Sequence, residues 1–279
     1  MKFRGKIIDP HCMRQFYSIV MILSKLCKNV VIRLSEKKLF LIALHESAAA
    51  SNQISVWSVL DQQSFFKDYT MSGDTEKNEI FFSLPIDMLA SSLSSAKQTN
   101  SVKTLKMKLT DKLSPCLTVE LELESLVSSK QLCVHDVPVS VIAPTEWSEY
   151  NEPNIPSPNI SVILPSIRVV RHVIDNMKRI GPRLMVTLNT SGKMILGISN
   201  LLSTVDTHFS NLEVVNPKTL YGETKYSTLV DIKKFSQFLN CEPLNLSRIL
   251  CHVVKGTLLH CSIEEDEFVL HYFLSGIDD

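Results

Sequence analysis

Apolar residues recur with helical period in several stretches of the chain, most clearly between Leu164 and Gly181. At about 100° per residue, the apolar residues fall on one broad face and a mostly cationic set falls on the other. Pro165 suits a first helical turn, and Gly181 followed by Pro182 stops a helix. The apolar face consists of Ile167, Val169, Val170, Val173, Ile174, Met177 and Ile180. The outer face consists of Arg168, Arg171, His172, Asp175, Lys178 and Arg179.

Three other stretches predict helices. Pro10–Lys28 predicts a second long helix, and Pro85–Lys97 predicts a short helix with a serine-rich outer face. Ile232–Asn240 predicts another short helix, with Asp231 placed to cap it. All but the serine-rich helix repeat a cationic outer stripe, although a merely solvated face explains each stripe equally well. The outer cations of these three stretches are Arg14, Lys25, Lys28, Lys97, Lys233 and Lys234.

Alternating or continuous apolar runs between these helices predict antiparallel strands. Each half of the chain then has the same order: a strand, a long helix, several strands, a short helix and more strands. Between the halves, the proline-rich stretch Pro144–Asn159 predicts an extended linker. The predicted strands are Met1–Asp9, Val30–Leu34, Leu39–Leu44, Ile54–Leu60, Phe65–Met71, Glu79–Leu84, Lys103–Leu109, Leu117–Leu123, Gln131–Ile142, Ile160–Leu164, Leu184–Leu188, Met194–Ile198, Thr204–Val214, Thr228–Val230, Ile249–Val254, Leu258–Ile263 and Phe268–Leu274.

The pattern therefore predicts an α+β fold with two similar domains. We place the first domain at residues 1–134, a connector at residues 135–158 and the second domain at residues 159–279. Two polar stretches, Glu46–Asn52 and Asn216–Tyr226, predict loops.

Charge and composition narrow the function classes. The 279 residues include 29 Lys and Arg and 29 Asp and Glu, so the formal charge is zero. This balance argues against a tail-mediated nucleic-acid binder, whose affinity needs net positive charge, but it permits cations gathered on one surface. The seven cysteines show no framework spacing and predict buried thiols in a reducing compartment. Apolar runs such as Ile19–Leu23 are too short to cross a membrane, so we expect a soluble intracellular protein.

Motifs for catalysis, cofactors and metals are absent from the sequence. There is no GxxxxGK[ST], GxGxxG or HExxH, and the Cys and His pairs lack the four converging ligands of a metal site. The sequence therefore predicts no cofactor, no metal and no enzymatic activity. A two-domain enzyme that uses a Cys/His pair around Cys133 or Cys251 stays open as an alternative, because such residues meet in space rather than in sequence.

Motifs spread over nearly the whole chain resemble the DNA sliding clamps. Leu164-Pro-Ser with Arg171, Asp175 and Ile180-Gly181 resembles a helix of proliferating cell nuclear antigen, and Leu270–Leu274 resembles its closing strand. A closer resemblance is to the hydroxyurea-sensitive subunit family of the heterotrimeric checkpoint clamp, the nine-one-one complex. The segments that carry it are Met1–Ile7, Lys25–Lys28, Trp57 with Phe65-Phe66, Asn78–Ile80, Leu109–Lys112, Pro115–Val119, His135–Pro138, Thr207–Phe209, Asp231–Lys234 and Gln237–Leu239.

This resemblance implies two tandem clamp domains, with helices lining the hole of a closed three-subunit ring and strands outside. It implies a non-enzymatic subunit that encircles double-stranded DNA at damage or stalled forks and serves checkpoint kinase signalling and repair enzymes. The implied partners are two different clamp subunits, an ATP-driven clamp loader, and checkpoint and repair proteins, with no membrane. The implied location is the nucleus, with the cytoplasm as a second compartment. A homotrimeric replication clamp is the first alternative.

The resemblance also implies roles for individual residues. The expected DNA-facing residues are Arg14, Lys25, Lys28, Lys97, Arg168, Arg171, Lys178, Arg179, Lys233 and Lys234. One expected subunit edge consists of Gln131, Leu132, Cys133, Val134 and His135. The other expected edge consists of Leu184, Met185, Val186, Thr187 and Leu188. A groove for partner peptides is expected at Val137, Val139, Val141 and Ile142, although ordinary strand packing explains these residues equally well.

Overall fold

A computed structural model describes residues 1–44, 54–73, 77–94, 102–123, 131–215, 224–240 and 248–277. The chain divides into two compact units. Unit 1 contains Met1–Glu152 and Glu265–Val269, and unit 2 contains Pro153–Glu264 and Leu270–Asp279. Each unit combines helices with antiparallel sheets, which confirms the predicted α+β class. The predicted loop Glu46–Asn52, most of the predicted loop at 216–226, and Lys97 lie outside the described residues.

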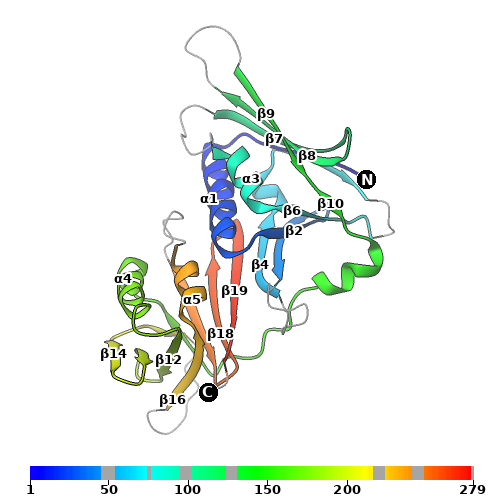
Figure 1. The fold of residues 1–279 in the computed structure, drawn as a ribbon. Helices are drawn as coiled ribbons and strands as arrows, with labels where there is room; N and C mark the ends of the chain where they lie inside the picture. Colours follow the sequence, from blue (N-terminus) through cyan, green and yellow to red (C-terminus); the bar gives the residue numbers. More distant parts are fainter. Residues whose placement is uncertain are drawn as a thin grey trace. The chain divides into compact units, whose positions relative to one another are not determined.

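Unit 1 holds one complete sheet, part of a second sheet and the first group of helices. The complete sheet has the strand order β5-β1-β7-β8-β9, and the strands of the second sheet follow the order β10-β6-β2-β3-β4. Helices α1 and α3 lie side by side in this unit (Figure 1). Its elements are β1 (Lys2–Ile7), α1 (Pro10–Leu26), β2 (Asn29–Leu34), β3 (Lys38–Leu44), β4 (Ile54–Asp61), α2 (Gln62–Phe65), β5 (Asp68–Ser72), β6 (Ile80–Pro85), α3 (Ile86–Ser92), β7 (Val102–Asp111), β8 (Pro115–Leu123), β9 (Gln131–Pro138), β10 (Ser140–Val141) and the 3₁₀ helix η2 (Pro144–Tyr150).

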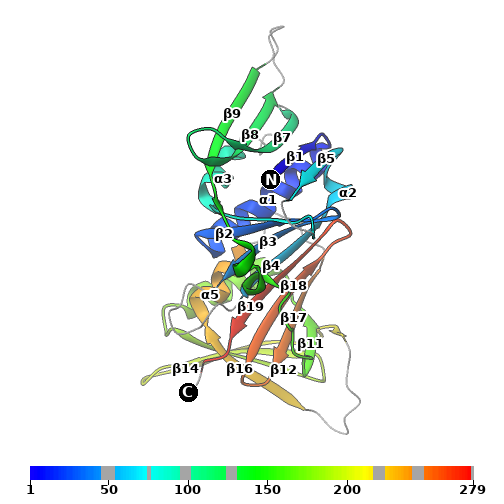
Figure 2. The ribbon, with the colours of Figure 1, turned by 90° about the vertical axis from the view of Figure 1, so that its right-hand side faces the viewer.

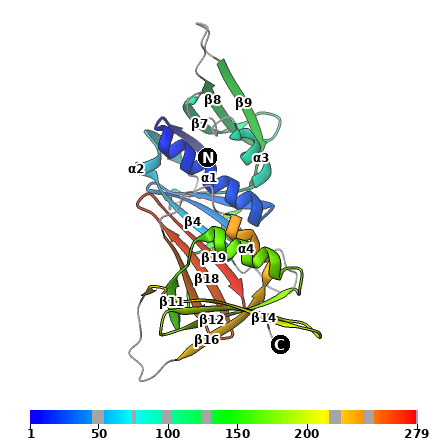
Figure 3. The ribbon, with the colours of Figure 1, turned by 90° about the vertical axis from the view of Figure 1, so that its left-hand side faces the viewer.

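Unit 2 repeats this organisation. Its complete sheet has the strand order β14-β13-β12-β16, and its part of the larger sheet has the order β19-β18-β17-β11-β15. In Figure 3, α4 crosses in front of strands of this unit. Its elements are β11 (Ile160–Ile163), α4 (Ile167–Met177), β12 (Arg183–Asn189), β13 (Lys193–Ser199), β14 (Thr204–Phe209), β15 (Val214–Val215), β16 (Lys225–Asp231), α5 (Ile232–Phe238), β17 (Ile249–Val254), β18 (Leu258–Glu264) and β19 (Phe268–Ser275), the last of which begins in unit 1.

Burial of one helix face positions each long helix on its sheet. In α1, Phe16, Ile19 and Leu23 are at most 1% exposed, and Asp9 caps the helix by accepting a 3.0 Å hydrogen bond from the His11 N–H. In α4, Val170, Ile174 and Met177 are the buried residues. These faces confirm the predicted helical period.

Two local predictions differ from the structure. Phe65, expected in a strand, ends the short helix α2, because the Asp61 carboxylate accepts the Ser64 N–H and starts a helical turn. Val169, expected on the buried face of α4, is 51% exposed, since the helix packs along a narrower stripe than its apolar residues allow.

The start of the predicted extended linker Pro144–Asn159 also differs from the structure, whereas the strand predicted at Gln131–Ile142 is present as β9 and β10. Residues 135–152 belong to unit 1, where β9 pairs with β8, and β10 pairs with β6. Residues 144–150 form η2, and Trp147 stacks on Phe81 of β6 at 4.5 Å between ring centroids. The Trp147 indole N–H also donates to the Ile142 carbonyl. These contacts fold the first part of the connector onto the sheet (Figure 2).

Three histidines of unit 2 form a partly buried cluster across β17, β18 and β19. The rings of His252 and His260 stack at 4.7 Å, His260 stacks on Phe273 at 4.8 Å, and a 3.0 Å hydrogen bond joins His260 Nε2 to His271 Nδ1. Burial, with help from the two neighbouring imidazoles, lowers the pKa of His260 to about 3. His260 is therefore neutral in the folded protein near pH 7.

This pKa predicts acid-sensitive stability. Between pH 6.5 and about pH 3 the unfolded chain binds a proton at His260 that the folded chain does not, so the free energy of unfolding falls as the pH falls. From pH 7 to pH 5, we expect the wild type to lose about 2 kcal/mol more than His260→Phe, which keeps a ring against Phe273. Urea unfolding at both pH values measures this difference, and equal losses in the two proteins would contradict the assignment.

Candidate nucleic-acid interface

The cations of unit 1 lie on the exposed side of α1 and just beyond its end. Arg14 and Lys25 are exposed, while their helix buries its opposite face in the unit 1 core. Lys28 is exposed in the chain that follows the helix, and its carbonyl accepts the Ile86 N–H at the start of α3. Three predicted cations of unit 1 are therefore on the outer side of α1 or next to it.

The neighbouring helix α3 carries little positive charge. Its exposed residues are Asp87, Met88 and Ser91, and its buried residues include Ile86 and Leu89. Its described part thus contributes an uncharged or acidic surface, in keeping with the predicted serine-rich face. Since Lys97 lies outside the described residues, its DNA-facing role stays a prediction.

The cations of α4 differ in how strongly they are already engaged. Arg168 is exposed, as is Arg179 in the turn after the helix. The Lys178 ammonium lies 2.7 Å from a carboxylate oxygen of Asp175 and donates to the Ser236 hydroxyl of α5 at 2.9 Å. Arg171 lies 3.9 Å from the same carboxylate. Asp175 therefore offsets part of the positive charge of this helix, and Lys178 joins α4 to α5.

Helix α5 presents its two lysines through a capped first turn. The Asp231 carboxylate accepts the N–H groups of Lys233 and Lys234 at 2.7 and 3.1 Å, which confirms the predicted cap. Lys233 is exposed and Lys234 is half-buried. The Tyr272 hydroxyl donates to the Lys234 carbonyl, and the Tyr272 ring stacks on Phe238 at 5.3 Å. These contacts hold α5 against β19, and α5 lies beside α4, where Lys178 donates to Ser236 (Figure 1).

The structure confirms an end-strand position for one predicted subunit edge and contradicts it for the other. β9, with Gln131–His135, ends its sheet, and Leu132 and Val134 are 55% and 48% exposed. β12, with Leu184–Leu188, lies inside its sheet, because β13 pairs with it on one side and β16 on the other. Its backbone groups are thus satisfied within unit 2, and the prediction of a free edge at Leu184, Met185, Val186, Thr187 and Leu188 is wrong.

The strands that end the sheet of β12 are β14 and β16. Two N–H groups outside that sheet, those of Gly256 and Ile277, donate to β16 carbonyls at Ser227 and Leu229. β14 exposes Val205 at 38%, and the loop before it exposes Leu201 and Leu202 almost completely. Among the described strands of this sheet, β14 is therefore the better candidate for an open edge.

Burial favours strand packing for most of the proposed peptide groove. Val137, Val139 and Ile142 are at most 8% exposed, whereas Val141 is 44% exposed. A cavity of about 350 Å³ lies beside Val137, between α3 and β9. Its lining consists of Asp87, Met88, Ser91, Ser92, His135, Asp136 and Val137. A groove for partner peptides at these four residues stays a prediction. Only the exposed side chain of Val141 and the cavity beside Val137 leave room for a bound peptide.

The described part of the chain shows neither a metal site nor, at Cys12, a reactive thiolate. No group of three or more His, Cys, Asp or Glu residues there could hold a metal ion. Cys12 is buried, and burial together with the Asp9 carboxylate raises the pKa of its thiol to about 11, so it is not a reactive thiolate. No helix in the described residues is long and apolar enough to cross a membrane.

Comparison with known proteins decides the family. The model of the family described as "Hus1-like protein" matches residues 1–278. The chain belongs to the Hus1-like family. The human checkpoint protein HUS1 is 34% identical over 99% of this chain and 100% of its own, and the Drosophila melanogaster checkpoint protein Hus1-like is 28% identical over 99% of each. In fold, this Hus1-like chain is similar to proliferating cell nuclear antigen from Entamoeba histolytica, with a TM-score of 0.73, 11% identity and 99% coverage of both chains.

Family and fold together give the general function. This Hus1-like chain is a checkpoint sliding-clamp subunit built on two tandem clamp domains, as its resemblance implied. A homotrimeric replication clamp is not favoured, because the full-length sequence identities of 34% and 28% are to checkpoint proteins, whereas the similarity to proliferating cell nuclear antigen is one of fold at 11% identity.

Proposed function

We propose that this chain is one of three different subunits of a ring that encloses double-stranded DNA in the nucleus. In this role it is a non-enzymatic platform that a clamp loader places on damaged or stalled DNA for checkpoint kinases and repair enzymes. The observation that carries the proposal is the repeated cationic exterior of α1, α4 and α5 in a chain with no net charge. Such helices suit loose, sequence-blind contacts to phosphates, because enclosure rather than tight binding keeps a ring on DNA.

The open strands support assembly into a ring. β9 and β14 each end a sheet and expose apolar residues, Leu132 and Val134 on one and Val205 on the other. Unpaired strand edges with exposed apolar side chains are unsafe in a monomer and are satisfied when another strand pairs with them. We propose β9 and β14 as the two ring edges, in place of β9 and β12.

The test is the composition of the assembled protein. When the chain carries an affinity tag in its own cells, we expect it to co-purify with two other clamp subunits in equal amounts, as measured by native mass spectrometry. Alone, it should scatter light as a 31.5 kDa monomer, because neither edge fits the other. A stable trimer of the isolated chain would contradict the proposal and favour the replication-clamp alternative.

A further inference from the structure

The open strand β14 has two chemically different faces. Asp206 points away from the unit 2 core, while Val205 and Thr207 point to the opposite face. On that opposite face, their partners on β13, Ile198 and Leu196, are buried. A strand added to β14 would therefore meet an apolar surface on one side and a carboxylate on the other.

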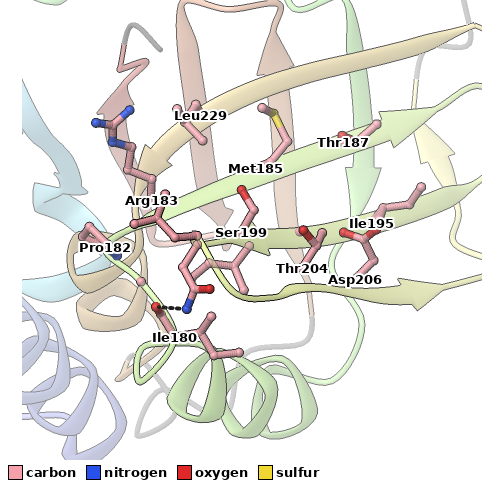
Figure 4. Close-up of a pocket in the computed structure, with 15 residues that line it drawn as sticks. Ile180, Pro182, Arg183, Met185, Thr187, Ile195, Ser199, Thr204, Asp206 and Leu229 are labelled. Carbon is pink, nitrogen blue, oxygen red and sulfur yellow. Dashed lines mark hydrogen bonds between the residues drawn. The ribbon is translucent and has the colours of Figure 1, made fainter.

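A cavity of about 640 Å³ opens on the side of this sheet where Asp206 lies (Figure 4). Met185, Ile195 and Leu229 give it an apolar floor, Asp206 lines it from the open edge, and Arg183 at the start of β12 lines it as well. Gly197 lies between Asp206 and Met185 in the strand register, and a Cβ at this position would come within 2.6 Å of Asp206 Oδ1. A carboxylate beside an apolar floor suits a side chain with an aliphatic stem and a cationic end, namely lysine or arginine.

The other open edge of this chain does not offer such a side chain. β9 places Leu132, Val134 and Asp136 on the face opposite to its core side, next to Glu122 and Glu120 of β8. Neither face of Gln131–Pro138 contains a lysine or arginine. If β9 of one copy paired with β14 of another, the Asp206 carboxylate would lose water against the apolar Leu132 or Val134, or would lie beside Asp136, whose carboxylate already holds the Lys112 ammonium.

We propose that the strand that pairs with β14 belongs to a different chain and carries a lysine or arginine beside Asp206, flanked by apolar residues that cover Val205. The proposal rests on the proposed use of β14 as a ring edge and adds the chemistry by which that edge accepts one partner. The same carboxylate disfavours a second copy of this chain, so it supplies specificity by exclusion as well as by attraction.

The test reverses the charge in the ring assembled from this chain and its two partner clamp subunits. Asp206→Lys should weaken the junction at β14 at least 10-fold, because like charges then face each other across the junction. Asp206→Asn should weaken it less and should reduce its dependence on salt. Asp266→Lys, the same change at an exposed turn, serves as the control and should assemble as the wild type does. Titration of the partner subunits, followed by light scattering, measures each junction.

Two results separate this proposal from the ring-edge proposal. If Asp206→Lys assembles like the wild type while Val205→Glu does not, β14 is a ring edge without a basic partner, and the present proposal fails. If Val205→Glu also assembles normally, β14 is not a ring edge, and both proposals fail. Since Asp206 is exposed, circular dichroism of the variants should match that of the wild type. Asp206→Asn removes the carboxylate without adding a positive charge, so its assembly can be compared with that of the wild type in the same way.

Discussion

Val205→Glu is expected to abolish one junction of the ring and to leave the isolated chain folded. Val205 is 38% exposed at the end of the sheet, on the side where β13 contributes the buried Ile198. A carboxylate fits there in the isolated chain, since water reaches it. In the assembled ring the neighbouring strand would bury that carboxylate without a cation on this face, which costs about 3–5 kcal/mol and weakens the junction by two orders of magnitude or more.

The corresponding change on the other edge sharpens this experiment. Val134→Glu on β9 should remove the opposite junction, so each variant should keep one partner subunit and lose the other. Val141→Glu is the matched control, because Val141 is similarly exposed at 44% but lies on β10, outside both proposed edges. Co-purification of each variant with each partner subunit separately measures which junction is lost. Loss of the same partner from both edge variants, or no loss from either, would be inconsistent with β9 and β14 as the ring edges.

Local signals predicted the elements of the fold well. Helical period located α1, α4 and α5, and the Asp231 cap is present with two backbone hydrogen bonds. The strands β12 and β13 also lie where they were predicted, and they pair with each other. Each of these features depends on residues a few positions apart, which propensity, capping and turn chemistry determine.

Features that depend on distant residues were predicted less well. β12 is a strand as expected, but whether it ends a sheet depends on β16, which follows more than thirty residues later. In β14, Val205 lies between two polar residues, and this alternation indicates a strand with one solvent-exposed face. Alternation does not show whether such a strand lies at the end of its sheet or inside it. Val169 shows the same limit on a helix, where packing decides how much of an apolar face is buried. The cationic stripes were visible in the sequence, whereas the contact of Lys178 with Asp175 and Ser236 needed the structure.

The helix cations give the second large expected effect. Replacing Arg168, Arg171 and Lys234 by glutamate should weaken association of the assembled ring with duplex DNA by roughly 10- to 1,000-fold near 0.1 M salt, because contacts to phosphates are lost and repulsion is added. The salt dependence should fall as well, by up to about 0.9 in the log–log slope for each phosphate contact removed. Fluorescence anisotropy of a labelled duplex between 50 and 200 mM salt measures both quantities.

The matched control changes the same net charge away from the helices. Lys38, Lys225 and Lys255 are exposed at the starts of β3 and β16 and in the turn after β17, so their replacement by glutamate should leave most of the affinity and the salt slope unchanged. A smaller effect is expected from Lys178→Glu alone, because Asp175 already balances that ammonium at 2.7 Å. Equal losses of DNA affinity in the helix triple variant and the control triple variant would mean that binding by the ring depends only on its total charge. In that case, α4 and α5 would not face the DNA.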